Sequence, residues 1–209
     1  MKMDVWVDFI CPYCYVSTMT LDRALKRLGN PEIEYIHHGY LLDPDASHVP
    51  GRNHLNWMAE KFDQTVEEAQ KGLDEGIGKK AHDNGVPFHP EKAVPANTKD
   101  AHLLTYLAGE KGLPRKAVVR FARAYYEEGL DLADDETLRR LSKDIGLGPV
   151  ALDTVRSHPA YEQKLDDDRA LFGELEIESI PHYIVNDAHI WPGSKTTDEF
   201  VEGLKKYLD

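Results

Sequence analysis

Basic residues and long apolar runs are both scarce in this chain of 209 residues. Lys and Arg together number 25 against 37 Asp and Glu, which leaves a formal net charge of −12. A broad nucleic-acid surface needs clustered Lys and Arg to meet the phosphates, so the acidic balance argues against a nucleic-acid partner. No apolar run approaches the roughly 20 residues that span a bilayer, so we expect no membrane partner either.

The first residues also lack the pattern of a secretory signal. Met1-Lys2-Met3-Asp4 reaches an acidic residue at once, whereas a signal peptide has a basic start and then ~7–15 apolar residues. We therefore expect a cytoplasmic protein. At roughly 150 residues per domain, the length suggests one large domain or one domain with a sizeable insertion. Hydrophobic residues make up 41% of the chain, which is enough to build a core and argues against disorder.

Cysteine is limited to two residues, Cys11 and Cys14, in the sequence Cys-Pro-Tyr-Cys. A structural disulfide scaffold is excluded, because a bridge across four residues staples almost nothing in a long chain. Two thiolates cannot complete a zinc site alone, although His37 and His38 would supply the other two ligands of a two-Cys, two-His site. From these residues alone, a redox pair, half of a metal site and coincidence all stay open. Of the three we take the redox pair forward, and we therefore expect no metal.

The first 40 residues alternate between strand and helix patterns. Residues 5–10 and 32–38 are rich in β-branched and aromatic side chains and predict strands. Leucines at helical spacing between them predict a helix that ends at Gly29-Asn30-Pro31. Cys11 and Cys14 therefore lie where the first strand gives way to the helix of a β-α-β unit, whose strands are normally parallel.

The middle of the chain is helical. A capping box at Thr65 opens a helix that we expect to continue to Asn84-Gly85, and Pro114 suits a first helical position. Asp134 or Asp135 can cap a later helix, and a last long helix includes residues 161–172. The acidic runs at 134–136 and 166–168 are expected to be solvated helix faces.

Strand patterns return near the end of the chain. Residues 182–185 and 189–191 predict two strands joined by a tight turn, and Thr196 or Thr197 caps a final helix. The strand types match the thioredoxin topology. We predict an α/β, thioredoxin-like fold formed by residues 1–42 and 175–209, with a large all-helical insertion of residues 43–174.

The position of Cys11 suggests how the pair would react. A thiolate is the species that attacks a disulfide, and a thiol at a helix N-terminus ionises more readily because unpaired N–H groups favour negative charge. Cys11 is therefore expected to be the nucleophile. Pro12 fits the first helical turn, and Cys14 lies on the same helix face, where it can resolve a mixed disulfide. Tyr13 lies between the cysteines and is expected to be exposed and to touch substrate.

Four other residues are candidates for the site. Asp8 precedes Cys11 and is expected either to accept the proton that Cys14 loses or to cap local backbone groups. Pro181 comes directly before a strand and is either an ordinary trans strand-entry proline or a cis-proline that faces the cysteines. His182 can approach Cys11 and favour its thiolate when charged. His102 either lines a cleft or packs as an ordinary histidine.

Four segments together resemble the DsbA family of thiol-disulfide oxidoreductases, in its FrnE-like branch. They are Asp8 to Cys14, Asn97 to His102, Phe121 to Gly129, and Ser179 to Pro181, in order along essentially the whole chain. The resemblance implies a thioredoxin fold with a helical insertion, Cys11 as nucleophile and Cys14 as resolving thiol. It also implies Pro181 as the cis-proline, and Ile180 as a source of backbone hydrogen bonds for a bound polypeptide.

The resemblance has two departures. The exported oxidants of the family carry a signal peptide, and they have His where this chain has Tyr13. A tyrosine supplies no positive charge to a neighbouring thiolate, so we expect a couple less oxidising than theirs, in the range of about −200 to −230 mV. The cofactor is then the redox-active disulfide itself, with glutathione as a candidate co-substrate. The expected partners are polypeptides or small molecules that carry thiols or disulfides.

Two other functions stay open. A kappa-type, glutathione-dependent transferase or isomerase resembles this fold, although such proteins typically have serine where Cys11 stands. A non-catalytic, chaperone-like module would instead hold apolar peptide in the helical block. The sequence leaves the oligomeric state, the physiological substrate and the direction of electron flow open.

Overall fold

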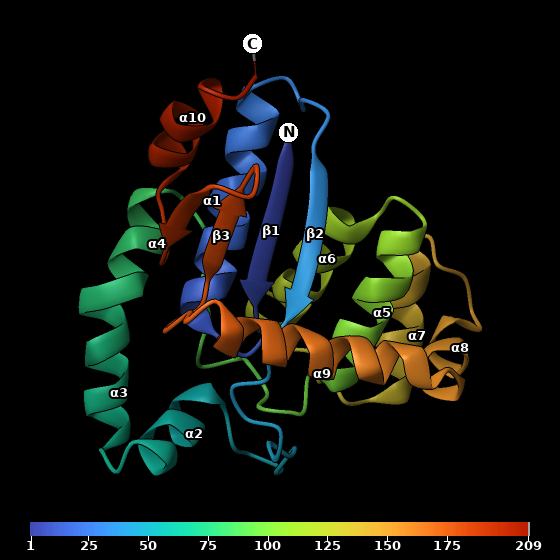
Figure 1. Cartoon of the computed structure of the whole chain (residues 1–209). Coiled ribbons are helices and arrows are strands. Elements are labelled where there is room, and N and C mark those ends of the chain that lie inside the picture. The colour runs from blue at the N-terminus through green and yellow to red at the C-terminus, as the bar shows by residue number, and fades with distance from the viewer. Residues whose placement is uncertain (209) are drawn as a thin grey trace.

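The computed structural model describes residues 1–208 and folds them into a four-stranded sheet surrounded by helices (Figure 1). The strands are β1 (Lys2–Val7), β2 (Glu34–Gly39), β3 (His182–Val185) and β4 (His189–Pro192). The helices, in chain order, are α1 (Pro12–Arg27), α2 (His54–Lys61), α3 (Val66–Leu73), the π-helix η1 (Asp74–Gly78), α4 (Lys79–Asp83), α5 (Lys99–Glu110), α6 (Pro114–Tyr126), α7 (Asp135–Ile145), α8 (Ala151–Ser157), α9 (Pro159–Glu174) and α10 (Thr197–Lys205).

The sheet confirms the predicted fold class and strand directions. Its order is β2-β1-β3-β4. β1 and β2 are parallel and are joined by α1, whereas β3 runs antiparallel to both β1 and β4. This is the β-α-β and β-β-α arrangement expected of a thioredoxin-like fold. In the register, Trp6 of β1 pairs with His38 of β2 on one side and with His182 of β3 on the other.

The predicted bounds of the first strand were wrong by three residues at each end. β1 spans Lys2–Val7, whereas residues 5–10 were expected. Phe9 and Ile10 are apolar because they lie buried in the turn that leads from β1 to α1, with 2% and 1% of their surfaces exposed. The second strand is displaced by one or two residues, and the third matches its prediction.

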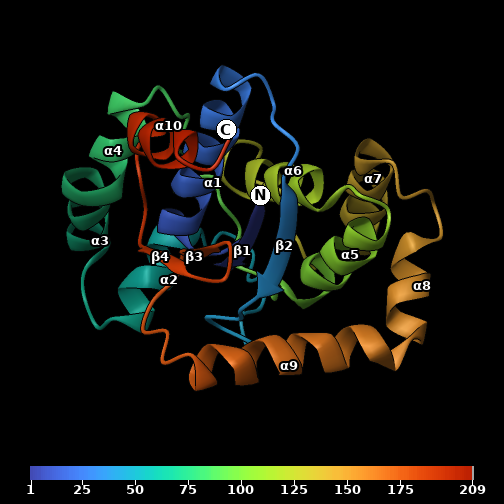
Figure 2. The same ribbon diagram turned by 45° about the horizontal axis from the view of Figure 1, so that its top comes forward.

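Helices cover both faces of the sheet. α10 packs against α1, and Phe200 of α10 contacts Tyr183 of β3 edge to face. α9 lies on the opposite side, as the long orange helix that crosses the ends of β1 and β2 in Figures 1 and 2. α6 packs against both α1 and β2. One continuous cluster of buried side chains joins the sheet to the helical block, and the boundaries at residues 43 and 174 stay a prediction.

Several helix starts follow the predicted capping chemistry. The hydroxyls of Thr65 and Thr196 each accept the N–H three residues on, and Asp134 caps α7 in the same way. Pro114 occupies the first turn of α6. The helix expected to run from Thr65 to Asn84 is instead interrupted by η1, where Gly76 leaves helical geometry (φ −96°, ψ −108°). An interruption of this kind keeps the helical spacing of apolar residues and so leaves no periodic signal.

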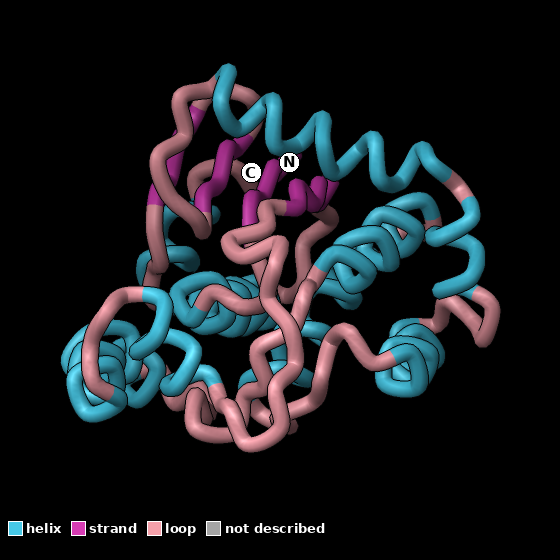
Figure 3. The backbone as a smooth tube through the Cα atoms, turned by 90° about the horizontal axis from the view of Figure 1, so that it is seen from below, coloured by secondary structure: helices cyan, strands magenta, loops and turns pink. Residues whose placement is uncertain are grey.

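The loops gather at the end of the sheet toward which β1 and β2 run, as Figure 3 shows from below. This end holds the turn from β1 to α1, and the loop before β3 reaches the same level because His182 pairs with Trp6. The fold therefore brings residues 8–14 and 180–182 together from distant parts of the sequence.

A buried ion cluster fastens α9 to the sheet. His38 of β2 lies between two carboxylates, with Nδ1 2.7 Å from Asp168 and Nε2 2.8 Å from Asp4. Asp168 also accepts hydrogen bonds from the Tyr106 hydroxyl at 2.7 Å and the Gly39 N–H at 3.0 Å. The expectation that residues 166–168 form a solvated face was wrong for Asp168, which is 3% exposed.

The charges of this cluster support one another. Burial alone would raise the pKa of Asp168, but hydrogen bonds from His38 and Tyr106 outweigh it and lower that pKa to about 2. Burial disfavours a charged His38, yet its bonds to Asp168 and Asp4 raise its pKa above 6.5. The contribution of His38 to stability is therefore fully present below pH 6.5 and is lost as pH rises through its raised pKa. The contribution of Asp168 is fully present above about pH 3.8 and is lost as pH falls through its lowered pKa.

Asp168→Asn should lower the free energy of unfolding by about 3–5 kcal/mol near pH 5.5, because it leaves a buried imidazolium without one partner. The loss should shrink as pH rises through the raised pKa of His38, since the imidazole then becomes neutral. Urea unfolding at a series of pH values measures both effects. Asp167→Asn, at the exposed neighbouring position, is the control; equal losses in the two variants would contradict the assignment.

Candidate active site

Cys11 is the N-cap of α1. Its backbone is extended (φ −80°, ψ 119°), Pro12 follows as the first helical residue, and its Sγ accepts the Cys14 N–H at 3.4 Å. An N-cap side chain normally satisfies one of the unpaired N–H groups of the first turn with an oxygen atom, and here a sulfur does so. The sulfur of Cys11 thus lies at the positive end of a 16-residue helix, as the sequence predicted.

The two cysteines are free thiols in unequal surroundings. Cys11 is 5% and Cys14 2% exposed, while Tyr13 between them is 45% exposed. Burial raises the pKa of the Cys14 thiol well above its ordinary value, and the hydrogen bond to Cys11 and the charge of Cys11 raise it further. A backbone hydrogen bond with Asp8 lowers this pKa, whereas the charge of Asp8 raises it. Cys14 therefore keeps its proton in the dithiol, and any reaction of its sulfur must move that proton.

The Ile180–Pro181 peptide bond is cis. Pro181 is buried, Ile180 is partly buried, and the Pro181 carbonyl accepts the Gly193 N–H at 2.9 Å, which ties the loop to the end of β4. His182 lies edge-on to Trp6, with ring centroids 6.0 Å apart. Burial lowers the pKa of His182, so its ring is neutral at pH 7 and the charged form considered from the sequence is disfavoured.

Asp8 is the buried carboxylate of the site and is 1% exposed. Its oxygens accept the Thr98 hydroxyl at 2.6 Å, the Leu42 N–H at 2.8 Å and the Ile10 N–H at 3.4 Å. Its backbone carbonyl accepts the Cys11 N–H at 3.2 Å. Asp8 thus holds local backbone groups, which is one of its two sequence readings, and the other, that it accepts the Cys14 proton, stays a prediction.

His102 packs in the interior, which is one of the two readings from the sequence. It is fully buried, and its Nε2 lies 3.4 Å from Asp8 Oδ1 while its Nδ1 lies 3.0 Å from His37 Nε2. The signal was present in the Asn97 to His102 segment, because Thr98, the N-cap of α5, and His102 lie one turn apart and both bond to Asp8. Sequence spacing does not identify the partner, which lies in the turn after β1.

His37 and His38, the histidines of the alternative zinc site, bond to other side chains. His37 bonds to His102, and His38 bonds to Asp4 and Asp168 on the opposite face of β2. Within residues 1–208, no group of three or more His, Cys, Asp and Glu side chains is arranged to hold a metal ion. In the same part of the chain, no helix combines the length and apolar character needed to cross a bilayer.

Known proteins resemble this chain over nearly its whole length. The model of the DSBA-like thioredoxin domain family matches residues 2–205. A protein described as a probable DsbA oxidoreductase, SCO1869 from Streptomyces coelicolor, superposes with a TM-score of 0.82 at 25% identity, covering 99% of this chain and 89% of its own. The cytosolic disulfide reductase DsbM from Pseudomonas aeruginosa, solved with GSH, has a TM-score of 0.69 at 19% identity, covering 100% and 99%. The uncharacterized protein YwbO of Bacillus subtilis (strain 168) is 23% identical over 96% of this chain and 94% of its own length.

Asp8→Asn should lower the pKa of Cys14, because it removes a negative charge that acts on the buried thiol. The thiol should still titrate above an ordinary cysteine, since burial is the largest cause of the raised pKa and remains. The pH dependence of the Cys14 ¹³Cβ chemical shift measures this. Asp22→Asn, which changes another carboxylate carried by α1, is the control; an unchanged Cys14 titration in Asp8→Asn would contradict the coupling.

Proposed function

The chain belongs to the DSBA-like thioredoxin domain family, and from this premise we propose that it exchanges disulfides through Cys11 and Cys14. The observation that carries the proposal is the sulfur of Cys11 at the N-cap of α1, bonded to the N–H of a second cysteine one turn later. A helix N-terminus favours a thiolate, and the spacing allows the second sulfur to reach the first.

The first chemical step uses Cys11. Its thiolate attacks one sulfur of a substrate disulfide, the substrate S–S bond breaks, and a mixed disulfide forms at Cys11 while the other substrate sulfur leaves and takes a proton from water. Tyr13 is the exposed residue between the cysteines and would contact the substrate. Ile180, before the cis peptide bond, would offer backbone hydrogen bonds to an extended polypeptide.

The second step uses Cys14. It gives up its proton and attacks the Cys11 sulfur, which releases the substrate as a dithiol reduced by two electrons and leaves a Cys11–Cys14 disulfide. Two thiols of the glutathione class would return the pair to the dithiol, the first by forming a mixed disulfide at Cys11 and the second by releasing it, and together they would be oxidised to one disulfide. Asp8 is the candidate acceptor for the Cys14 proton, because it is the carboxylate whose charge acts on that thiol.

We expect the protein to reduce or isomerise substrate disulfides rather than to form them. Tyr13 supplies no positive charge beside Cys11, so the dithiol receives less charge stabilisation than in family members with histidine there. A cytoplasmic location would add a reducing environment. DsbM, which shares the fold, is described as a cytosolic reductase, and its structure with GSH makes glutathione a reasonable first co-substrate to test.

Cysteine variants separate the three functions considered from the sequence. Cys11→Ser should abolish insulin reduction, and Cys14→Ser should block turnover while accumulating a mixed disulfide with substrate or glutathione, visible by mass spectrometry. A glutathione-activating transferase would stay largely active in Cys14→Ser. A chaperone-like module would suppress aggregation equally well in all variants, and insulin reduction unaffected by Cys11→Ser would contradict the proposed exchange.

The redox potential tests the role of Tyr13. Equilibration with glutathione should give about −200 to −230 mV for the Cys11–Cys14 couple. Tyr13→His should shift the potential to a less negative value by tens of millivolts, because about 30 mV corresponds to 1.4 kcal/mol of stabilisation of the reduced form. Tyr13→Phe is the matched control, since it removes the hydroxyl without adding charge. A wild-type potential near −120 mV would contradict the proposal.

A further inference from the structure

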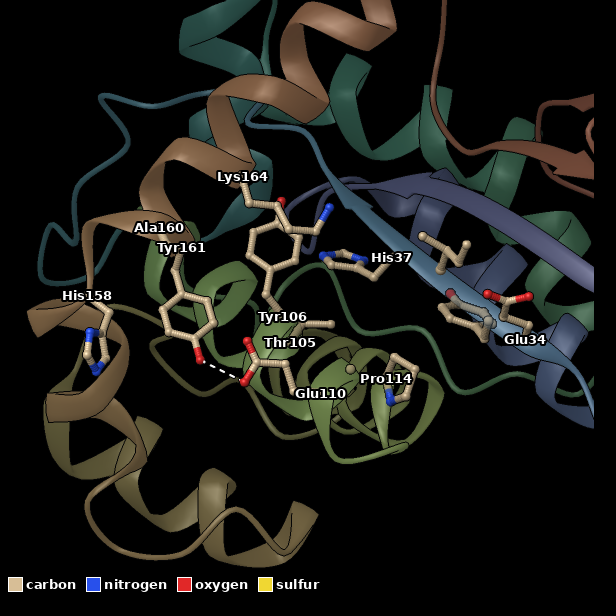
Figure 4. Close-up of a pocket in the computed structure, with 13 residues that line it drawn as sticks. Glu34, His37, Thr105, Tyr106, Glu110, Pro114, His158, Ala160, Tyr161 and Lys164 are labelled. Carbon is tan, nitrogen blue, oxygen red and sulfur yellow. Dashed lines mark hydrogen bonds between the residues drawn. The ribbon is translucent and has the colours of Figure 1, made fainter.

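A pocket of about 710 Å³ opens at the free edge of β2, outside the thiol site. Figure 4 shows it enclosed by β2, α5 and the first turns of α9, with His37 on one wall and Tyr106 beside it. Other polar groups around it are Lys164 and the Tyr161 hydroxyl, which bonds to Glu110 at 3.1 Å. The function described above makes no use of this pocket.

His37 connects the pocket to the interior. Its ring is 3% exposed and stacks on that of His102, with centroids 5.1 Å apart and an angle of 10° between the rings. Its Nε2 bonds to His102, whereas its Nδ1 is buried and has no hydrogen-bond partner among the described residues. A buried polar atom without a partner is uncommon and calls for an explanation.

The hydrogen bonds determine which ring nitrogens carry protons. Asp8 is an acceptor, so His102 donates to it from Nε2–H and keeps a lone pair on Nδ1. That lone pair accepts Nε2–H of His37, which leaves a lone pair on His37 Nδ1. The row therefore runs from a buried, unpartnered nitrogen of a pocket-lining histidine to the carboxylate whose charge acts on Cys14.

We propose that His37 and His102 form a proton relay between the pocket and Asp8, which supplies Cys14 when the enzyme disulfide is reduced. The inference rests on the proposed disulfide exchange. A water molecule that moves from the pocket into contact with the buried His37 Nδ1 delivers a proton there, the Nε2 proton of His37 moves to His102 Nδ1, and the Nε2 proton of His102 moves to Asp8. Each ring gains one proton and loses one, and Asp8 becomes neutral and can protonate Cys14.

The reductive step creates the need for such a proton. When a reductant thiolate attacks Cys11 Sγ, the Cys11–Cys14 bond breaks and Cys14 leaves with the electron pair. A sulfur with a high pKa is a poor leaving group, and burial raises the pKa of Cys14 well above its ordinary value. Protonation of the sulfur as it leaves therefore lowers the barrier, as a general acid does.

The surroundings of His37 suit transfer rather than storage of a proton. Burial and the nearby charge of His102 lower its pKa well below 6.5, so the ring returns to its neutral state after each transfer. The titratable groups around it come from β2, α5 and α9: His102 and Tyr106 contact its ring, and the charges of His38, Lys164 and Asp168 also act on it.

Replacement of His37 tests the relay. His37→Gln keeps an N–H in the place of Nε2, so it preserves the bond to His102 but cannot pass a proton. His37→Ala opens the row to the pocket. Stopped-flow reduction of the oxidised protein by dithiothreitol should be slower on the order of tenfold in both variants, less than for a general acid that touches the reacting atom. His158→Gln changes an exposed histidine of the pocket wall outside the row and should match the wild type.

Chemical rescue separates a relay from a structural role. Added imidazole should restore reduction of His37→Ala in proportion to the imidazolium concentration, because the cation carries the missing proton, and should leave His158→Gln unchanged. Wild-type rates in His37→Gln would overturn the relay, and so would a slow His37→Ala that imidazolium does not accelerate. Both results leave disulfide exchange intact, whereas an inactive wild-type protein would remove the proposed function itself.

Discussion

The hydrogen bonding of the buried Asp8 carboxylate is the interaction on which the site depends. A charge with 1% exposure is tolerated only when several donors satisfy it, and Asp8 receives them from the turn before α1, from the loop after β2 and from α5. Its carbonyl holds the Cys11 N–H at the same time. One residue thus holds the strand-to-helix turn and joins the helical block to the sheet, and its charge adds to the effect of burial on the pKa of Cys14.

Two adjacent histidines show how the two faces of one strand give neighbouring residues different surroundings. Successive residues of a strand point to opposite faces, so His37 and His38 meet different neighbours. His38 lies between two carboxylates, and its pKa is raised; His37 meets another histidine, and burial lowers its pKa. His38 is a charged residue that ties α9 to the sheet through Asp168. His37 is a neutral ring whose Nδ1 has no hydrogen-bond partner among the described residues.

The sequence predicted the parts of the fold that local rules govern. Apolar spacing, capping residues and β-branched content gave the order of strands and helices, and the position of Cys11 at a helix start followed from the same rules. Hydrogen bonds between side chains of distant segments could not be predicted from these local rules. Asp168 looked like a surface acid and His102 like an ordinary histidine, because their partners, His38 and Asp8, come from strand and turn segments far away in the chain.

The raised pKa of Cys14 constrains how the proposed redox couple can be tuned. Cys14 keeps its proton in the dithiol, and a neutral thiol gains no stabilisation from nearby positive charge. Cys14 therefore adds no such stabilisation to the reduced state. That stabilisation must come from the surroundings of Cys11, where the N–H groups of the first turn of α1 act and Tyr13 adds no charge. A protein built in this way adjusts its potential at the exposed position between the cysteines, while the interior beneath them governs the movement of the proton.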